Sequence, residues 1–420
     1  MLSINKITQY YFLLLLFSPL LSYHTLRSFN ISSQYYMGVM ISLIGIMYLT
    51  LSQKKIKIPE YAWWLFLYII YTLVWSFNTG EIEERGYRVF SKNQLIHVFF
   101  ALIVIENFNF TDRFVYRIRP ILKYTVIAAA AVSIIQLFYF SFMDANPIWT
   151  RGEIGETLFG DLYKDRRSSI FGFVDPNELG LSYLPLLSVL IGLLMYNRNK
   201  YYYIFLLLGG ISAFLSNTRY VMVAFVLLSL QIFIVQKESI QGILRYLLIT
   251  FFLGFFLIQF LNFIGYNLDD WVSDRLFPEG SLQETTRYKA FITFGIFFPE
   301  HPWLGIGSMT DELKEASAQI AQSSQIHVGY LSHLVYYGIF GSFLAFGFWF
   351  KLARHLLKTA KLTNYWGSFF AFLIFLWANA TLVTFHIFFY GIIIALAVDK
   401  YFRDKIAMQK RLKMTVSNLS

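Results

Sequence analysis

Cysteine is absent from this sequence and charged residues are scarce. Because none of the 420 residues is a cysteine, disulfide bonds, thiolate nucleophiles and cysteine-ligated zinc sites are excluded. Charged residues make up only 14% of the chain, whereas soluble domains carry about 25%. Hydrophobic residues make up 57%, so the few charges cannot cover the apolar material with a water-soluble surface. The composition therefore predicts an integral membrane protein.

Acidic residues are fewer than basic ones, 25 against 35, which gives a net charge of +10. In a membrane protein this excess is expected from the Lys and Arg bias of cytoplasmic loops, so we expect no nucleic-acid partner. The first apolar run, residues 10–21, has no small-residue cleavage site and contains Pro19. This run predicts a retained membrane helix and not a signal peptide.

The apolar runs approach the ~20 residues that a helix needs to cross a bilayer. They predict an all-α, polytopic protein with a single membrane domain over residues 1–420 and about twelve transmembrane helices. The twelve spans are expected near residues 8–24, 34–52, 61–78, 93–108, 122–143, 178–196, 201–216, 219–236, 243–265, 328–350, 365–383 and 385–400.

The distribution of basic residues predicts the orientation of these spans. Most Lys and Arg fall in alternate connections such as "KKIK" (54–57), "RFVYRIRPILK" (113–123) and "KLARHLLKTAK" (351–361). Because Lys and Arg collect on the cytoplasmic side, both termini are expected to be cytoplasmic. Two long loops, 144–177 and 266–327, then lie outside.

Several arginines are expected on the outer side, against this bias. Arg166 and Arg167 precede residues 175–178, "DPNE", which have the capping pattern of a helix start. The two arginines fit either lipid headgroups or a diphosphate. Arg219, in "LSNTRYVMVAF", opens a helix after a three-residue polar turn. Snorkelling would explain it, but an arginine at membrane depth is costly enough to favour a functional role.

The second outer loop contains "QETTRYKAFITFGIFFPEHPWLGIG", residues 283–307. Its apolar part, 288–297, predicts a helix that is too short to span the membrane and lies at the membrane surface. Arg287 stands at the start of this helix, where free N–H groups also favour an anion, and its fork can hold diphosphate oxygens. Lys289 is a further candidate substrate-binding residue, and His301 is expected to be structural.

Two histidines stand in "QIHVGYLSHLVYYGIFG", residues 325–341. At 100° per residue, His327 and His333 face different sides of a helix, which argues against a metal site shared by the two. His327, at the mouth of the helix, is a candidate general base, with a hydrogen-bonded helix start as the alternative. His333 is expected to serve packing, and Tyr330 is a candidate substrate-binding residue.

Four motifs, "RSSIFGFVDPNELG", "LSNTRYVMVAF", "TTRYKAFITFGIFFPEHPWLGIG" and "IHVGYLSHLVYYGIFG", occur in an order that resembles the O-antigen ligase/polymerase family of bacterial membrane glycosyltransferases. The resemblance covers roughly residues 165–345. It implies that Arg219 and Arg287 bind a diphosphate and that His327 is the catalytic histidine. Ligases of the family commonly have Asn after this histidine, whereas Val328 follows it here, which favours a polymerase.

The resemblance implies a glycan linked through diphosphate to a polyprenyl lipid as the donor, with neither metal nor cofactor. A polymerase passes this glycan to another lipid-linked repeat unit, and a ligase passes it to lipid A-core. The implied location is the cytoplasmic (inner) membrane with an outward-facing active site, and a chain-length regulator protein is an expected partner. A polysaccharide flippase is the alternative from another class, although transporters usually place charges near the bilayer midplane.

Overall fold

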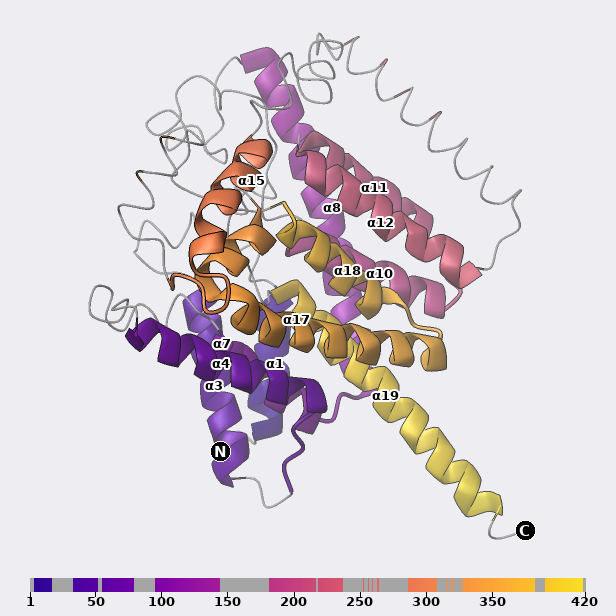
Figure 1. The fold of residues 1–420 in the computed structure, drawn as a ribbon. Coiled ribbons are helices and arrows are strands. Elements are labelled where there is room, and N and C mark those ends of the chain that lie inside the picture. The colour runs from indigo at the N-terminus through magenta and orange to yellow at the C-terminus, as the bar shows by residue number, and fades with distance from the viewer. Residues whose placement is uncertain are drawn as a thin grey trace.

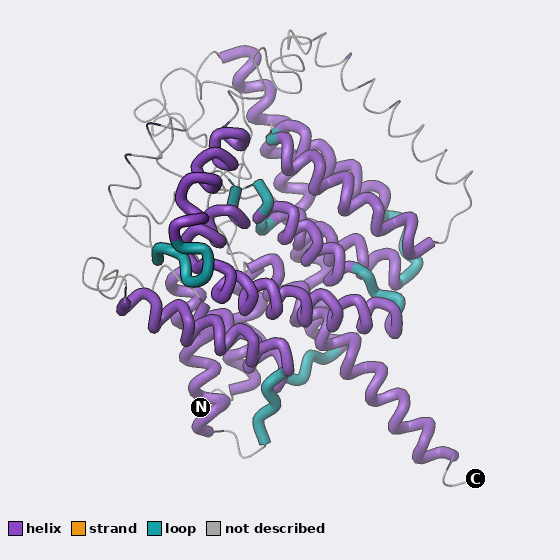
Figure 2. The backbone as a smooth tube through the Cα atoms, in the orientation of Figure 1, coloured by secondary structure: helices purple, strands orange, loops and turns teal. Residues whose placement is uncertain are grey.

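The computed structural model describes residues 4–16, 33–51, 55–78, 95–143, 181–216, 218–236, 286–307, 328–381 and 390–417, with the single positions 252, 256, 259, 263, 315, 319 and 326. The regular elements in these ranges are all helices (Figures 1 and 2). They are α1 (Ile4–Leu16), α3 (Ser33–Leu51), α4 (Glu60–Asn78), α7 (Leu95–Asn107), α8 (Asp112–Met143), α10 (Tyr183–Tyr196), α11 (Tyr202–Leu215), α12 (Arg219–Gln236), α15 (Thr286–Phe297), the 3₁₀ helix η5 (Phe298–Glu300), α17 (Gly329–Thr363), α18 (Gly367–Asn379) and α19 (Tyr390–Ser417).

The all-α prediction is confirmed, and α3, α4, α7 and α12 begin and end within two residues of the predicted spans. The basic segments 113–123 and 351–361 are helical extensions of α8 and α17, and the basic tail extends α19. The predicted span 243–265 and helix start 175–178 lie outside the described residues, apart from four single positions. Among the described helices, one, Gly329–Thr363, is long and apolar enough to cross a membrane, so the number of spans stays a prediction.

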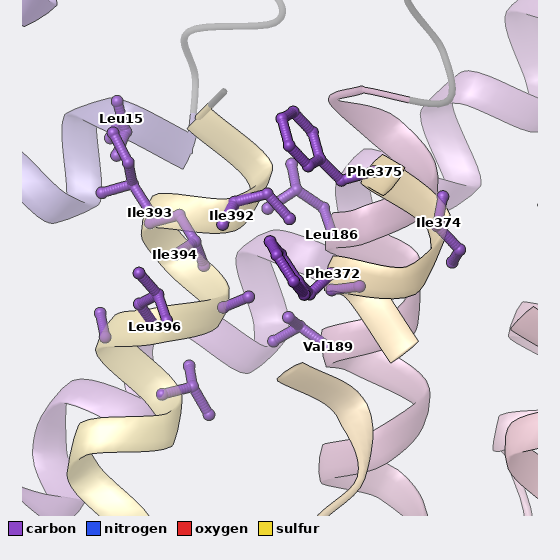
Figure 3. Close-up of a cluster of buried hydrophobic side chains, with 14 of the residues drawn as sticks. Leu15, Leu186, Val189, Phe372, Ile374, Phe375, Ile392, Ile393, Ile394 and Leu396 are labelled. Carbon is purple, nitrogen blue, oxygen red and sulfur yellow. The ribbon is translucent and has the colours of Figure 1, made fainter. Parts of the chain in front are cut away.

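The larger half of the bundle consists of α8, α10, α11, α12, α18 and α19, and α10 lies at its centre. Every residue from Tyr183 to Met195 is buried, as expected for a helix that is apolar on all sides. It contacts α8, α11, α12, α18 and α19. Figure 3 shows Leu186 and Val189 of α10 beside Phe372 of α18, with Ile392 of α19 next to Leu186.

The helix α17 connects this half to a smaller group formed by α1, α3, α4 and α7. It packs along α4 on one side and contacts α18 and α19 on the other. The two helices α4 and α17 run antiparallel, since Glu60 pairs with Lys351 (2.5 Å) while Tyr71 contacts Tyr337. The hydrogen bond from Lys351 lowers the pKa of the exposed Glu60 carboxyl below its ordinary value. The helix α17 therefore contacts helices of both halves of the bundle.

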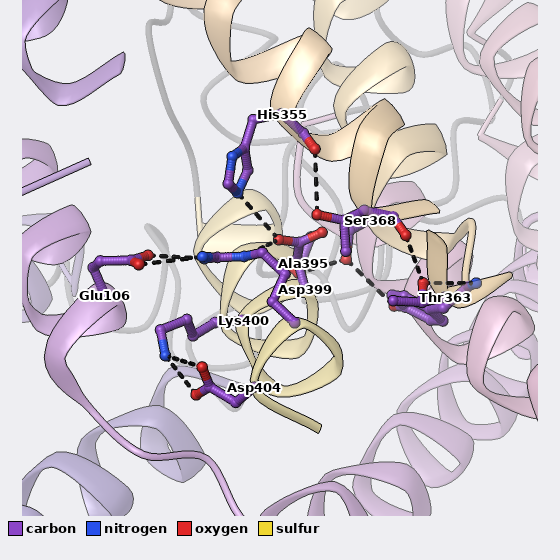
Figure 4. A network of polar contacts seen from close by, with 11 residues as sticks. Glu106, His355, Thr363, Ser368, Ala395, Asp399, Lys400 and Asp404 are labelled. Carbon is purple, nitrogen blue, oxygen red and sulfur yellow. Dashed lines mark hydrogen bonds and ion pairs between the residues drawn. The ribbon is translucent and has the colours of Figure 1, made fainter. Parts of the chain in front are cut away.

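A polar network ties α7, α17 and α19 together far from the start of α17 (Figure 4). Arg403 donates to both carboxylate oxygens of Glu106 (2.8 and 3.2 Å) and to Asp399 (3.0 Å). His355 Nε2 lies 3.6 Å from the same Asp399 oxygen. Asp399 is only 2% exposed, and a buried carboxylate requires such partners. The network therefore holds the basic end of α19 to the bundle.

Candidate functional site

The helix α17 is broken at Gly338, nine residues after it begins. Gly338 has φ 61° and ψ −167°, which is far from helical geometry. The sequence predicted a span over residues 328–350, and the structure shows a break within it that was not predicted. In a bilayer a break is tolerated only where other groups bind the freed backbone donors and acceptors. In this structure the turn at residues 301–307 binds the freed donors and acceptors of α17.

On the carbonyl side of the break, the turn that follows η5 supplies the donors. In a regular helix the Val335 and Tyr336 carbonyls would accept from the N–H groups four residues later. Here the N–H of Ile306 donates to the Val335 carbonyl (3.0 Å), and the N–H of Gly307 donates to the Tyr336 carbonyl (2.8 Å). The turn thus replaces the missing helical turn as a donor.

On the amide side of the break, the same turn supplies the acceptors. The N–H of Ile339 donates to the Pro302 carbonyl (2.8 Å), and the N–H of Phe340 donates to the Trp303 carbonyl (3.1 Å). Two donors and two acceptors are therefore exchanged between residues 301–307 and α17. We call this arrangement, residues 301–307 docked on residues 335–340, the joint.

Two glycines permit the close approach in the joint. Gly305 has φ 76° and Gly338 has φ 61°, a region that side chains disfavour. A Cβ atom on Gly338 would lie 2.4 Å from the Trp303 carbonyl oxygen, and one on Gly305 would lie 2.5 Å from the Tyr336 carbonyl oxygen. These neighbours are backbone atoms and cannot rotate away. Only glycine fits at both positions without moving the backbone.

The start of α17 packs against α15 in a small apolar cluster next to the joint. Its buried members are Ala290, Ile326, Val328 and Val335, surrounded by Phe294, Phe297, Phe298, Ile306, Leu331 and Tyr336. Ala290 lies three residues after Arg287, while Ile326 and Val328 flank His327. The segments that carry Arg287 and His327 are therefore neighbours, although they are 40 positions apart in the chain.

The start of α12 reaches the same place through α18. The Tyr330 hydroxyl donates to the Leu376 carbonyl (2.5 Å), which joins the second residue of α17 to α18. The next residue of α18, Trp377, donates from Nε1 to the Tyr220 carbonyl (3.0 Å). Tyr220 directly follows Arg219. The segments with Arg219 and His327 are thus separated by one layer of α18.

The structure places the predicted site residues to different extents. Arg219 is the first residue of α12 and Arg287 the second residue of α15, but their side chains lie outside the described part of the chain. His327, Arg166 and Arg167 lie outside it altogether. The structure therefore brings together the backbone segments of three of the five, and the positions of these side chains stay predictions.

Lys289 and Tyr330, the other predicted substrate-binding residues, are both half-buried. Lys289 lies in the first turn of α15, and its carbonyl accepts a hydrogen bond from Thr293. The Tyr330 ring contacts Phe346 and Trp349 edge to face, with centroids 5.9 and 5.8 Å away. Tyr330 thus packs between helices, and a role in substrate binding stays a prediction.

Among the described helices, three have their N-termini close to the start of α17. The helices α12, α15 and α17 begin at Arg219, Thr286 and Gly329, and their first two turns are linked by the contacts above. Each helix N-terminus carries about half a positive charge and free N–H groups. Their proximity makes this end electropositive even before the arginine side chains are counted. Such a region favours a multiply charged anion such as diphosphate.

His333 lies before the break in α17, on the face that packs against α4, and is only 1% exposed. Its Nε2 is 3.4 Å from the Tyr68 hydroxyl, and its ring centroid is 5.0 Å from that of Tyr337. These contacts agree with the packing role predicted for His333. They also connect the first part of α17 to α4 beside the joint.

The joint and the residues of α4 that support it were not predicted from the sequence. The Tyr71 hydroxyl contacts two carbonyls, those of Leu304 in the turn and Tyr337 in α17, both at 2.9 Å. The available signal was the glycine spacing of "PWLGIG" (302–307) and "YYGIFG" (336–341). Glycines in a turn and within a helix indicate a close backbone contact, but no pattern reveals which two segments meet.

The composition and the helical bundle identify the chain as a helical integral membrane protein. One helix of membrane-spanning length is broken, and the helix N-termini that lie together make one end of the bundle electropositive. Residues 204–346, about a third of the chain, match the family described as O-antigen ligase. The matched region runs from α11 past the joint and includes Arg219, Arg287 and His327. It confirms the resemblance drawn from the motifs. No curated protein sequence matches the chain.

Proposed function

We propose that the protein is a bacterial polysaccharide polymerase that transfers a glycan from polyprenyl diphosphate to a hydroxyl of another lipid-linked repeat unit. The observation that carries this proposal is the convergence of the segments with Arg219, Arg287 and His327 at the start of α17. The family match supports a lipid-linked glycan as the substrate. The reaction belongs on the outer face of the cytoplasmic membrane, as the charge distribution predicts, and both termini are then cytoplasmic.

In the proposed reaction, the acceptor oxygen forms a bond to the anomeric carbon while the bond from that carbon to the diphosphate oxygen breaks. His327 takes the proton of the acceptor hydroxyl as the general base. Polyprenyl diphosphate leaves with the electron pair of the broken bond and gains negative charge. Arg219, Arg287 and the three helix N-termini stabilise that charge, which is where electrostatic catalysis acts. No metal is required for these steps.

The arginines provide the test. Arg219→Ala and Arg287→Ala should each lower polymer synthesis about 10²–10³-fold, the usual effect of losing one preorganised donor to a developing oxyanion. Lysine at either position should rescue poorly, because it lacks the bidentate fork. Arg113→Ala is the matched control, since Arg113 is an exposed arginine in the first turn of α8. Near-normal polymer from either site variant would remove that arginine from the site.

A ligase is the second candidate, because the matched family is described as O-antigen ligase. The glycan ladder of a deletion strain separates the two activities. A single repeat unit on lipid A-core identifies a polymerase, since the ligase is still present. Loss of all repeats from the core identifies a ligase. A chain-length regulator is the protein partner expected if the chain is the polymerase.

A further inference from the structure

Tyr71 contacts the joint from a part of the chain outside the family match, which covers residues 204–346. It lies in α4, near the end that faces the start of α17. Its hydroxyl is shared between the Leu304 carbonyl of the turn and the Tyr337 carbonyl, directly before the break. One side chain of α4 therefore holds both parts of the joint at 2.9 Å.

The joint connects two arms that carry proposed site residues. On one side, residues 301–307 continue from α15 and η5, so movement of the turn moves the helix that begins beside Arg287. On the other side, the first nine residues of α17 lead back from Gly338 to His327. The two arms meet again in the cluster of Ala290 with Ile326 and Val328. Their relative position therefore depends on how firmly the turn is held to α17.

The body of the molecule restrains the joint through α4. Gly341, after the break, leaves room for the Tyr71 ring, because a Cβ there would lie 2.5 Å from Tyr71 Cε1. Tyr68, one helical turn earlier, contacts His333 and Tyr337. The ring of Tyr71 thus packs against α17 at Gly341, and its hydroxyl projects to the two carbonyls. Such a preorganised donor loses little freedom when it binds them.

We propose that Tyr71 is a positioning residue for the glycan transfer: its hydroxyl locks the turn to the broken helix and so fixes the helix of Arg287 relative to the start of α17, which follows His327. This inference rests on the proposed function. The donor diphosphate would bind on the arginine side, while the base would act on the acceptor. A displacement of about 1 Å between such groups can lower a rate about 10²-fold.

Tyr71→Phe removes the hydroxyl and keeps the ring. With purified protein and lipid-linked repeat units, kcat should fall at least about tenfold, within the range expected for misplacement, while KM for the donor stays nearly unchanged. Tyr48→Phe is the matched control, because the Tyr48 hydroxyl also contacts another helix, through Asn5 of α1 (3.2 Å), but lies away from the joint. It should leave both constants unchanged.

A second measurement follows the joint without any activity. Since the chain has no cysteine, Ile292→Cys on α15 and Phe350→Cys after the break provide two exposed positions for spin labels. The distance distribution between the labels should broaden in the Tyr71→Phe background and not in the Tyr48→Phe background. Broadening together with the loss of kcat supports the inference.

The other outcomes overturn it. A fall in kcat with an unchanged distance distribution means that Tyr71 acts in another way. A broadened distribution with unchanged kcat means that the joint does not set the reaction geometry. If the unaltered protein transfers no lipid-linked glycan, the proposed function fails and the inference about the reaction fails with it. The spin labels still show in that case whether Tyr71 secures the joint, so the two failures are distinguished.

Discussion

Replacing Gly338 by alanine is the sharpest test of the joint. The new Cβ would lie 2.4 Å from the Trp303 carbonyl oxygen and 2.6 Å from the Gly305 nitrogen, both of which are backbone atoms. Gly338 also has backbone angles that are almost restricted to glycine, and a side chain there costs about 1–3 kcal/mol. The collision is relieved only when residues 301–307 move away from α17.

That movement lengthens the hydrogen bonds that Ile339 and Phe340 donate to the turn. Each donor that is left buried without an acceptor costs about 1–3 kcal/mol. Together with the backbone strain, the free energy of unfolding should fall by about 3–9 kcal/mol. An unfolding entropy of roughly 0.9 kcal/mol per degree for a chain of this length converts the loss to about 3–10 °C.

The assay is thermal unfolding of the detergent-purified protein, followed by its tryptophan fluorescence. Gly295→Ala is the matched control, since a Cβ on this α15 glycine has no neighbour within 4 Å. Alanine is favoured over glycine within a helix by about 0.5–1 kcal/mol, so the control should melt at the same temperature or slightly higher. If Gly338→Ala melts together with the control, the turn and α17 are not locked together and the reasoning is refuted.

Two further predictions concern topology and the histidines. Reporters fused after Asp161 and Gly280 should be extra-cytoplasmic and one after Lys358 cytoplasmic; the same side for Asp161 and Lys358 would show that the span count is wrong. In vitro turnover should fall about 10²–10⁴-fold in His327→Ala with donor binding largely intact, whereas His333→Ala should mainly lower the melting temperature because it removes a buried side chain that contacts α4. An inactive His333→Ala beside an active His327→Ala would reverse the assignment.

The helices could be predicted from the sequence because each apolar run is a local signal. The predicted boundaries of α12 coincide with the observed ones, and the short helix α15, predicted over residues 288–297, begins two residues earlier, at Thr286. The prediction failed where the structure depends on contacts between distant segments. The run that follows His327 is apolar on both sides of Gly338, so its hydrophobicity alone could not reveal the break.

The candidate site could be predicted only in part, because it too depends on contacts between distant segments. Charge against the topological bias identified Arg219 and Arg287, since an unfavourable position is visible in a single sequence. The supporting residues carry no such signal. Tyr71 is one of 29 tyrosines in an aromatic-rich chain, and its role appears only when α4 lies beside the joint. Trp377 likewise becomes informative only through its bond to Tyr220.

The exchange of hydrogen bonds in the joint has a consequence for the order of biosynthesis. An unsatisfied backbone group in the bilayer costs several kcal/mol, so the broken part of α17 cannot remain alone in lipid. Its partners, residues 301–307, leave the ribosome before it, as does Tyr71. The turn is therefore already synthesised when Gly338 is inserted, and it can bind the broken part of α17 at once. Placing the same turn after α17 in a permuted chain would expose the break during insertion, and we expect such a chain to be degraded.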